Sequence, residues 1–128
     1  MSLSTRSISM LPPVYANEKD MEQMCFALIE NAIHAADGKK QRKLVVSGRK
    51  ADDKVMLRFE DTCGGILPEQ VDRIFEPFFT TKPPGEGTGL GLCIVDRVVR
   101  QAGGTIRVEN RPGEGVTFHV TLPVQRSA

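Results

Sequence analysis

The sequence predicts an α/β (α+β) two-layer sandwich, in which a mixed, mostly antiparallel sheet is covered on one face by about three helices. Two segments carry apolar residues at three-and-four spacing and run into glycine, which is typical of helices packed on a core. Other segments alternate apolar and polar residues, which is typical of half-buried strands. The order helix, two strands, helical turn, loop, helix and hairpin predicts that the helices share one face of the sheet.

The first predicted helix spans residues 19–36, and Asp37-Gly38 ends it with a residue that is free to take positive φ. Its apolar stripe consists of Met21, Met24, Cys25, Leu28, Ala32 and Ala35. A short helix opens at residues 67–70, with Pro68 early, where its missing N–H costs little. The last helix begins at Thr88, which can cap it, and stops at Gly103-Gly104. Its buried stripe is Leu90, Ile94, Val95, Val98 and Ala102.

Valine content and alternation predict four strands, at residues 43–49, 54–60, 106–108 and 116–122. The last two form a hairpin that turns at Pro112-Gly113, and residues 14–16 add a short edge strand. Residues 77–87 are rich in glycine and proline and show no periodicity, so they form a loop. A connection of this length in a small domain is typical of a lid or a binding loop.

Composition limits the possible function classes. The 128 residues, 14.1 kDa, leave room for one domain, and 40% hydrophobic with 26% charged residues is an ordinary globular balance. Because Lys and Arg exceed Asp and Glu by only one charge, no global field attracts nucleic acid or a membrane, and any polyanion must be bound locally. The cysteines are odd in number and lack metal-ligand spacing, so neither a disulfide framework nor a zinc site is expected. A cytoplasmic location follows as the expectation.

The expected domain spans residues 13–124. Residues 1–12 lack the apolar stretch of a signal peptide and are interpreted as a tag remnant and linker, and residues 125–128 as a tail.

A glycine-rich loop at residues 85–92 runs into the last helix and is the strongest local signal. Glycines let the backbone approach a ligand closely, and the first N–H groups of a helix lack intrahelical partners. With the helix dipole they form a cradle for phosphate. The alternative is a flexible loop with a close helix–sheet contact. The segment is neither a Walker loop, since it lacks Gly-Lys-Ser/Thr, nor a dinucleotide fingerprint, since it does not directly follow a strand.

Asp61 ends a predicted strand and is followed by Gly64-Gly65. Continuing the alternation from Val55 through Phe59 places Asp61 on the face that buries the core, where an unpartnered carboxylate costs several kcal/mol. The exocyclic amine of a purine is one suitable partner, and the two glycines leave room for the flat base. Alternatively, Asp61 accepts backbone N–H bonds within a glycine turn.

Asn31 and His34 lie on one face of the first helix. An uncharged amide oxygen among phosphates is a suitable ligand for Mg²⁺, which is usually shared with the nucleotide. Glu30 supplies a carboxylate that can orient a nucleophile. The alternatives are that Asn31 is a surface or buried hydrogen-bonding residue, that His34 is structural, and that Glu30 is a solvated helix charge.

Together these segments resemble the ATP-binding catalytic domain of two-component sensor histidine kinases, within the superfamily of DNA gyrase, heat-shock chaperones and mismatch-repair ATPases. Residues 28–33 resemble the asparagine box, residues 61–66 the first glycine box and residues 85–92 the second. Residues 74–82, Ile-Phe-Glu-Pro-Phe-Phe-Thr-Thr-Lys, resemble the phenylalanine box, which separates histidine kinases from the other branches.

The resemblance implies a Bergerat-type ATP-binding fold, with ATP held between the sheet and the helices under a lid. It implies that Asn31 ligates Mg²⁺, that Asp61 binds the adenine amine, and that Gly65 and Ile66 lie beside the base. Lys82 is implied to reach the terminal phosphate, and His34 lies inside the implied ATP site. The residues implied to line the phosphates are Gly87, Thr88, Gly89, Leu90 and Gly91. Phe75, Phe78 and Phe79 are implied to anchor the lid or to meet the partner domain, the alternative being plain core.

Two residues depart from the family pattern. Ala27 stands where many relatives have a second polar residue one helical turn before Asn31, so one metal or water contact is missing unless Glu30 supplies it. Cys63 stands where the first glycine box usually has glycine. This change narrows the adenine pocket, shifts the turn by one residue or places a thiol near the base; the alternative, which we favour, is a buried, inert cysteine, since no nearby cation indicates a thiolate. In the predicted strand at residues 116–122, Thr117 falls on the face opposite to the apolar residues, and it is therefore left out of the site.

The resulting prediction is a protein-histidine kinase domain that binds Mg-ATP and donates the γ-phosphate to a histidine. That histidine lies on a separate dimerisation domain of the parent protein, with a response regulator downstream. Since neither His34 nor His119 lies in an acceptor helix, the fragment alone is not expected to phosphorylate itself. The alternatives are an ATPase of the same superfamily and a catalytically degraded nucleotide-binding module that serves as a protein-interaction surface.

Overall fold

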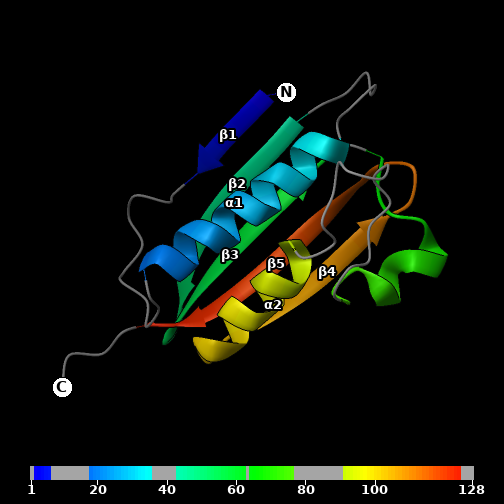
Figure 1. Cartoon of the computed structure of the whole chain (residues 1–128). Coiled ribbons are helices and arrows are strands. Elements are labelled where there is room, and N and C mark those ends of the chain that lie inside the picture. Colours follow the sequence, from blue (N-terminus) through cyan, green and yellow to red (C-terminus); the bar gives the residue numbers. More distant parts are fainter. Residues whose placement is uncertain (1, 7–17, 36–42, 63, 77–90, 125–128) are drawn as a thin grey trace.

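The computed structural model describes residues 2–6, 18–35, 43–62, 64–76 and 91–124. The elements are β1 (Ser2–Arg6), α1 (Glu18–Ala35), β2 (Lys43–Ala51), β3 (Lys54–Asp61), the 3-10 helix η2 (Pro68–Arg73), α2 (Gly91–Gln101), β4 (Thr105–Arg111) and β5 (Gly115–Pro123). Both α-helices cover the same face of one sheet, as Figure 1 shows. The predicted two-layer α/β architecture is therefore confirmed, and the third helix among the described residues is the short 3-10 helix η2.

The sheet has the strand order β1-β2-β3-β5-β4, and every neighbouring pair except β1–β2 is antiparallel. The four strands predicted from alternation are all present, and their ends differ from the predicted ones by at most three residues. Register fixes which residues share a face, because directly paired residues point the same way. Asp61 of β3 pairs with Leu44 of β2 and with Val116 of β5, and Val116 pairs with Asn110 of β4.

The first strand differs from the sequence analysis, which left residues 1–12 outside the domain. The structure places Ser2–Arg6 at the edge of the sheet, parallel to β2, with Ser2 paired to Lys43 and Arg6 to Ser47. Pairing of this kind uses backbone N–H and C=O groups, and the segment carries no strong apolar pattern that reveals it in advance. The edge strand expected at residues 14–16 lies outside the described residues.

Both helices bury the faces that their periodicity predicts, with one addition. Met24, Leu28 and Ala32 of α1 are buried, as are Val95 and Val98 of α2. Val99 is also fully buried, although the predicted stripe omitted it. After the last residue of α2, Gly103 takes φ +79°, and the Gly104 N–H donates to the Val99 carbonyl at 2.9 Å. The predicted glycine stop is therefore confirmed.

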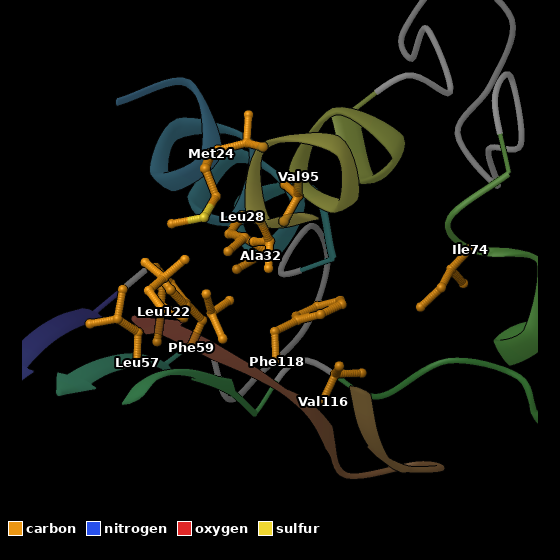
Figure 2. Packing of buried hydrophobic residues seen from close by; sticks show 14 of the residues in the cluster. Met24, Leu28, Ala32, Leu57, Phe59, Ile74, Val95, Val116, Phe118 and Leu122 are labelled. Carbon is orange, nitrogen blue, oxygen red and sulfur yellow. The ribbon is translucent and has the colours of Figure 1, made fainter. Parts of the chain in front are cut away.

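The core lies between the helices and the sheet. Figure 2 shows Met24, Leu28 and Ala32 of α1 and Val95 of α2 above side chains that rise from β3 and β5. The sheet side of this cluster includes Leu57 and Phe59 of β3 and Val116, Phe118, Val120 and Leu122 of β5. Ile74, just after η2, reaches the same cluster from the end of the sheet near Val116. The core therefore ties the segment after Asp61 to the rest of the domain.

The opposite face of the sheet carries a network of charged side chains. Glu109 interacts with His119 at 3.0 Å and with Arg111 at 3.3 Å, and the hydrogen bond with His119 lowers the pKa of the Glu109 carboxyl. Arg111 also donates to the Thr117 hydroxyl at 3.2 Å, which confirms that Thr117 lies on this face. We call this side of the sheet, which neither α-helix covers, the open face. Its residues serve as controls in the binding experiments below.

The described residues also bear on the expectations about membrane-spanning helices and about the cysteines. Within these ranges, no helix has both the length and the apolar character that crossing a bilayer requires. Cys25 and Cys93 are half-buried thiols, and burial raises the pKa of the Cys25 thiol, so it stays protonated near neutral pH.

Candidate nucleotide-binding site

Asp61 lies at the end of a central strand on the covered face, with only 4% of its surface exposed. The predicted burial of this carboxylate is therefore confirmed. It shares its row of the sheet with Leu44 and Val116, which are both buried and apolar. Asp61 makes an interaction within the chain, so a contact with adenine is a further role that binding must test.

The segment after Asp61 leaves the sheet through a glycine turn. Gly64 and Gly65 take φ values of +99° and +76°, which side chains other than glycine rarely adopt. The Gly64 N–H donates to the Glu114 carbonyl at 3.1 Å, and the Gly64 carbonyl accepts from the Gly113 N–H at 2.8 Å. The turn is thus attached to the β4–β5 hairpin, and Figure 1 shows η2, which follows it, beside that end of the sheet.

The requirement for glycine at position 65 has a structural cause besides room for a base. A Cβ on Gly65 would lie 2.6 Å from the Arg111 carbonyl oxygen and 3.1 Å from Asn110 Oδ1. Any side chain at this position therefore forces the turn away from β4 in addition to straining its φ. The sequence interpretation, that the two glycines leave room for a purine, stays a prediction.

Asn110 is a site-related residue that the sequence analysis missed. Its Oδ1 accepts a hydrogen bond from the Ile66 N–H at 2.8 Å, and its Nδ2 donates to the Ile66 carbonyl at 2.7 Å. The alternation that begins at Ile106 and Val108 places Asn110 on the covered face. The reasoning that was applied to Asp61 would therefore have identified Asn110 as well, had it been extended to this strand. Ile66 itself is half-buried and packs against the core.

On the helical side, Asn31 and Glu30 are half-buried on α1, between the buried residues Leu28 and Ala32. His34 belongs to the last turn of α1, and its side chain lies outside the described part. One turn before Asn31, the Ala27 Cβ lies 3.9 Å from the position that a Cβ on Gly91 would take. The asparagine-bearing turn therefore lies beside the start of α2, where the predicted phosphate cradle ends.

Gly91 is the first residue of α2 and the only predicted phosphate-lining residue among those that the structure describes. Lys82, Gly87, Thr88, Gly89 and Leu90 lie outside the described residues, as do Cys63, Phe78 and Phe79. Their roles stay predictions.

Phe75 belongs to the phenylalanine-box segment and packs on the sheet. Its ring meets that of Phe118 edge-on, with centroids 6.3 Å apart and an interplanar angle of 81°. This contact favours the core alternative for Phe75, in which the ring holds the segment after η2 against the sheet.

Replacing Phe75 tests this packing. We expect Phe75→Leu to lower the stability of the domain by about 1 kcal/mol, because it removes the edge-on contact while keeping an apolar side chain. In thermal denaturation of Phe75→Leu, Phe118→Leu and the double variant, the two losses should be coupled by about 1 kcal/mol. Strictly additive losses would show that the two rings do not support each other.

A shared Mg²⁺ ion fits the oxygen donors that the described residues provide. Within the described residues, no three His, Cys, Asp or Glu side chains gather where they could hold a metal ion. Mg²⁺ usually keeps several waters and takes one or two protein oxygens together with substrate phosphates. The amide oxygen of Asn31, one helical turn after Ala27, is a donor of that kind.

Comparison with known proteins identifies the family of this domain. Residues 16–126 match the family described as histidine kinase-, DNA gyrase B- and HSP90-like ATPases. The chain belongs to this family. Sensor histidine kinase ZraS of Salmonella typhi is 38% identical over 114 residues, which is 89% of this chain and 24% of the relative. Sporulation kinase E of Bacillus subtilis is 34% identical over 92% of this chain and 16% of the relative.

Solved structures give the same assignment. The catalytic domain of histidine kinase ThkA superimposes with a TM-score of 0.79 at 32% identity, covering 95% of this chain and 78% of that one. Full-length ShkA in complex with AMPPNP superimposes with a TM-score of 0.81 at 28% identity, covering 99% of this chain and 26% of that one. The chain is therefore an ATP-binding catalytic domain of the histidine kinase type, and it spans about a quarter or less of the curated relatives described above.

Proposed function

We propose that this domain binds Mg-ATP between the sheet and the helices and donates the γ-phosphate to a histidine on a separate dimerisation domain of the parent protein. The phosphate then passes to a response regulator in two-component signalling. Support comes from the family match and from relatives that are sensor histidine kinases. The Cys25 and Cys93 thiols agree with a cytoplasmic setting.

The observation that carries the proposal is the buried carboxylate of Asp61 at the end of β3, followed by two glycines with positive φ. A carboxylate oxygen can accept a hydrogen bond from the adenine amine, and the burial of Asp61 makes that bond stronger than the same bond in water. Ala27, one helical turn before Asn31, lies beside Gly91 at the start of α2. Asn31 and the start of α2 supply the groups for the other end of the nucleotide.

The reaction rests on positioning and on charge neutralisation. The imidazole nitrogen of the acceptor forms a bond to the γ-phosphorus while the bond from that phosphorus to the β–γ bridging oxygen breaks, which leaves ADP. Bound Mg²⁺ supplies positive charge to the phosphate oxygens. The chain itself orients the base through Asp61 and holds the phosphate end through Asn31, Lys82 and the amides that open α2, while Glu30 orients the nucleophile.

Replacing Asn31 tests the metal role. We expect Asn31→Ala to weaken binding of an ATP analogue by about 10-fold in the presence of Mg²⁺, because one oxygen ligand of the shared ion is lost. Calorimetric titration with Mg²⁺ and with EDTA should show that the difference between the variant and the wild type disappears without the metal. Equal affinities of the two proteins under both conditions would contradict the assignment of Asn31.

The proposal also predicts what the fragment cannot do alone. Incubated with ATP labelled at the γ-phosphate, it should acquire no acid-labile phosphate, since neither His34 nor His119 is proposed as the acceptor. Labelling of this fragment by itself would contradict the separate acceptor domain. Failure of the wild type to bind nucleotide at all would favour the degraded, protein-interaction alternative, which Ala27 and Cys63 keep open.

A further inference from the structure

The amide of Asn110 holds one residue of the first glycine box by both of its backbone polar groups. Its Oδ1 accepts from the Ile66 N–H at 2.8 Å and its Nδ2 donates to the Ile66 carbonyl at 2.7 Å, across 44 positions of sequence. Two hydrogen bonds to one residue fix its orientation as well as its distance, as a neighbouring strand does. Asn110 thus acts in place of a strand for a segment that has already left the sheet.

The rest of the same turn is held by backbone groups. Gly64 exchanges hydrogen bonds with Gly113 and Glu114 of the hairpin, and Gly65 lies close against the Arg111 carbonyl. Both glycines have positive φ, so the turn has few conformational restraints of its own. Among the hydrogen bonds that attach residues 64–66 to the hairpin, those of Asn110 come from a side chain and can be altered by substitution without changing the backbone.

Asn110 also lies in the row of the sheet that contains Asp61. Val116 pairs with both residues, so the two are separated by two strand spacings, roughly 10 Å, on the covered face. Asp61 lies at one end of this interval, while Asn110 and the turn that it holds lie at the other.

We infer that Asn110 is a positioning residue of the nucleotide site, which fixes the turn of residues 64–66 opposite Asp61 and thereby sets the affinity for the adenine end of ATP. The inference rests on the proposed function, because it assigns the base to this part of the covered face. Asn110 acts through Ile66 and Gly65 and need not touch the ligand.

The substitution Asn110→Asp makes this role visible as a pH profile. An ionised carboxylate keeps the acceptor for the Ile66 N–H but presents a second oxygen to the Ile66 carbonyl, so one hydrogen bond becomes a repulsion. A protonated carboxyl restores the donor and is nearly the same shape as the amide. The carbonyl opposite raises the pKa of the new carboxyl, so restoration should begin above the usual range for aspartate.

The experiment compares the full chain with Asn110→Asp and Asn110→Ala, by calorimetric titration with an ATP analogue and Mg²⁺ between pH 8 and pH 5, below every melting temperature. At pH 8 both variants should bind about 10-fold more weakly than the wild type. Towards pH 5, Asn110→Asp should approach wild-type affinity, whereas Asn110→Ala should stay weak. Affinities are compared with the wild type at each pH, because the wild type and the variants share Asp61 on the covered face and the neighbours Glu109, Arg111 and His119 on the open face.

A matched control separates positioning from general loss of stability. Val55→Ala removes buried volume at the other end of β3, six residues or roughly 20 Å from Asp61, and should lower the melting temperature without changing the affinity at any pH. Asn110→Ser, whose hydroxyl reaches at most one of the two Ile66 groups, provides a milder variant if Asn110→Asp does not fold. It should show a smaller loss of affinity than Asn110→Ala.

The outcomes are distinguishable. Wild-type affinity in the Asn110 variants, with a lowered melting temperature, would overturn the inference and reduce Asn110 to a structural attachment, while leaving the proposed function intact. A loss of affinity in Asn110→Asp that is the same at every pH would overturn it too, since the hydrogen-bond geometry would then not be the cause. A wild-type chain that binds no nucleotide overturns the proposed function, and this inference with it.

Discussion

Asp61→Asn is expected to lower the affinity of this domain for ATP by about 100-fold, because a charge-assisted hydrogen bond to the adenine amine is replaced by a weaker neutral one. Asparagine is nearly the same size and shape as aspartate, so the fold should survive the change at this buried position. Calorimetric titration with ATP and with inosine triphosphate measures the effect. Inosine presents an oxygen where adenine presents the amine, so the wild type should reject it, whereas the amide of the variant can donate to it. The preference for ATP should therefore collapse together with the affinity.

Asp53→Asn is the matched control for this prediction. It makes the same chemical change on an exposed aspartate in the turn directly before β3, at the other end of the strand from Asp61, and it should leave both nucleotide affinities unchanged. An Asp61→Asn variant that binds ATP as tightly as the wild type, or that still rejects inosine triphosphate, would show that the carboxylate serves the glycine turn and not the base.

Gly115→Ala is expected to destabilise the domain by about 3 kcal/mol or more, which corresponds to a fall of roughly 10 °C in melting temperature. Gly115 is buried where β5 begins, and a Cβ there would run into the carbonyl oxygen of Asp61. Because the obstacle is backbone, it cannot be relieved by a side-chain rotation, and β5 must separate from β3 at the predicted base site. Nucleotide affinity should therefore fall along with the melting temperature, as measured by thermal denaturation and titration.

Gly113→Ala tests whether the close approach or merely the loss of a glycine is responsible. Gly113 has φ +79° but nothing within 4 Å of an added Cβ, so its substitution should cost only the strain of a left-handed residue, about 1–2 kcal/mol. If the two variants lost equal stability, the contact between Gly115 and the Asp61 carbonyl would not be restrictive.

The parts of the fold that the sequence predicted are those in which side chains carry the signal. The alternation through Val55, Leu57 and Phe59 predicted both the strand and the burial of Asp61, and both are confirmed. The stripe of α1 was visible because each buried residue lies three or four positions from the next. These elements bury one face, so the period of the apolar residues records their geometry.

What the sequence did not reveal depends on backbone groups and on distant partners. β1 is held by backbone pairing with β2, to which the sequence of Ser2–Arg6 contributes no clear pattern. The bond between Asn110 and Ile66 joins residues 44 positions apart, so local spacing cannot show it, even though alternation placed Asn110 on the covered face. Gly65 and Gly115 were visible as glycines, but the carbonyl oxygens that they approach are known only from the fold.

The most direct test of the central claim is a titration of the ¹⁵N-labelled chain with Mg²⁺ and a non-hydrolysable ATP analogue, followed by the backbone amide signals. The account predicts shifts at Asp61, at Gly65 and at Gly91, with the open-face residues Glu109 and His119 unmoved. A saturated complex that leaves Asp61 and Gly65 unchanged, or that shifts only the open face, would contradict the placement of the nucleotide on the covered face of the sheet.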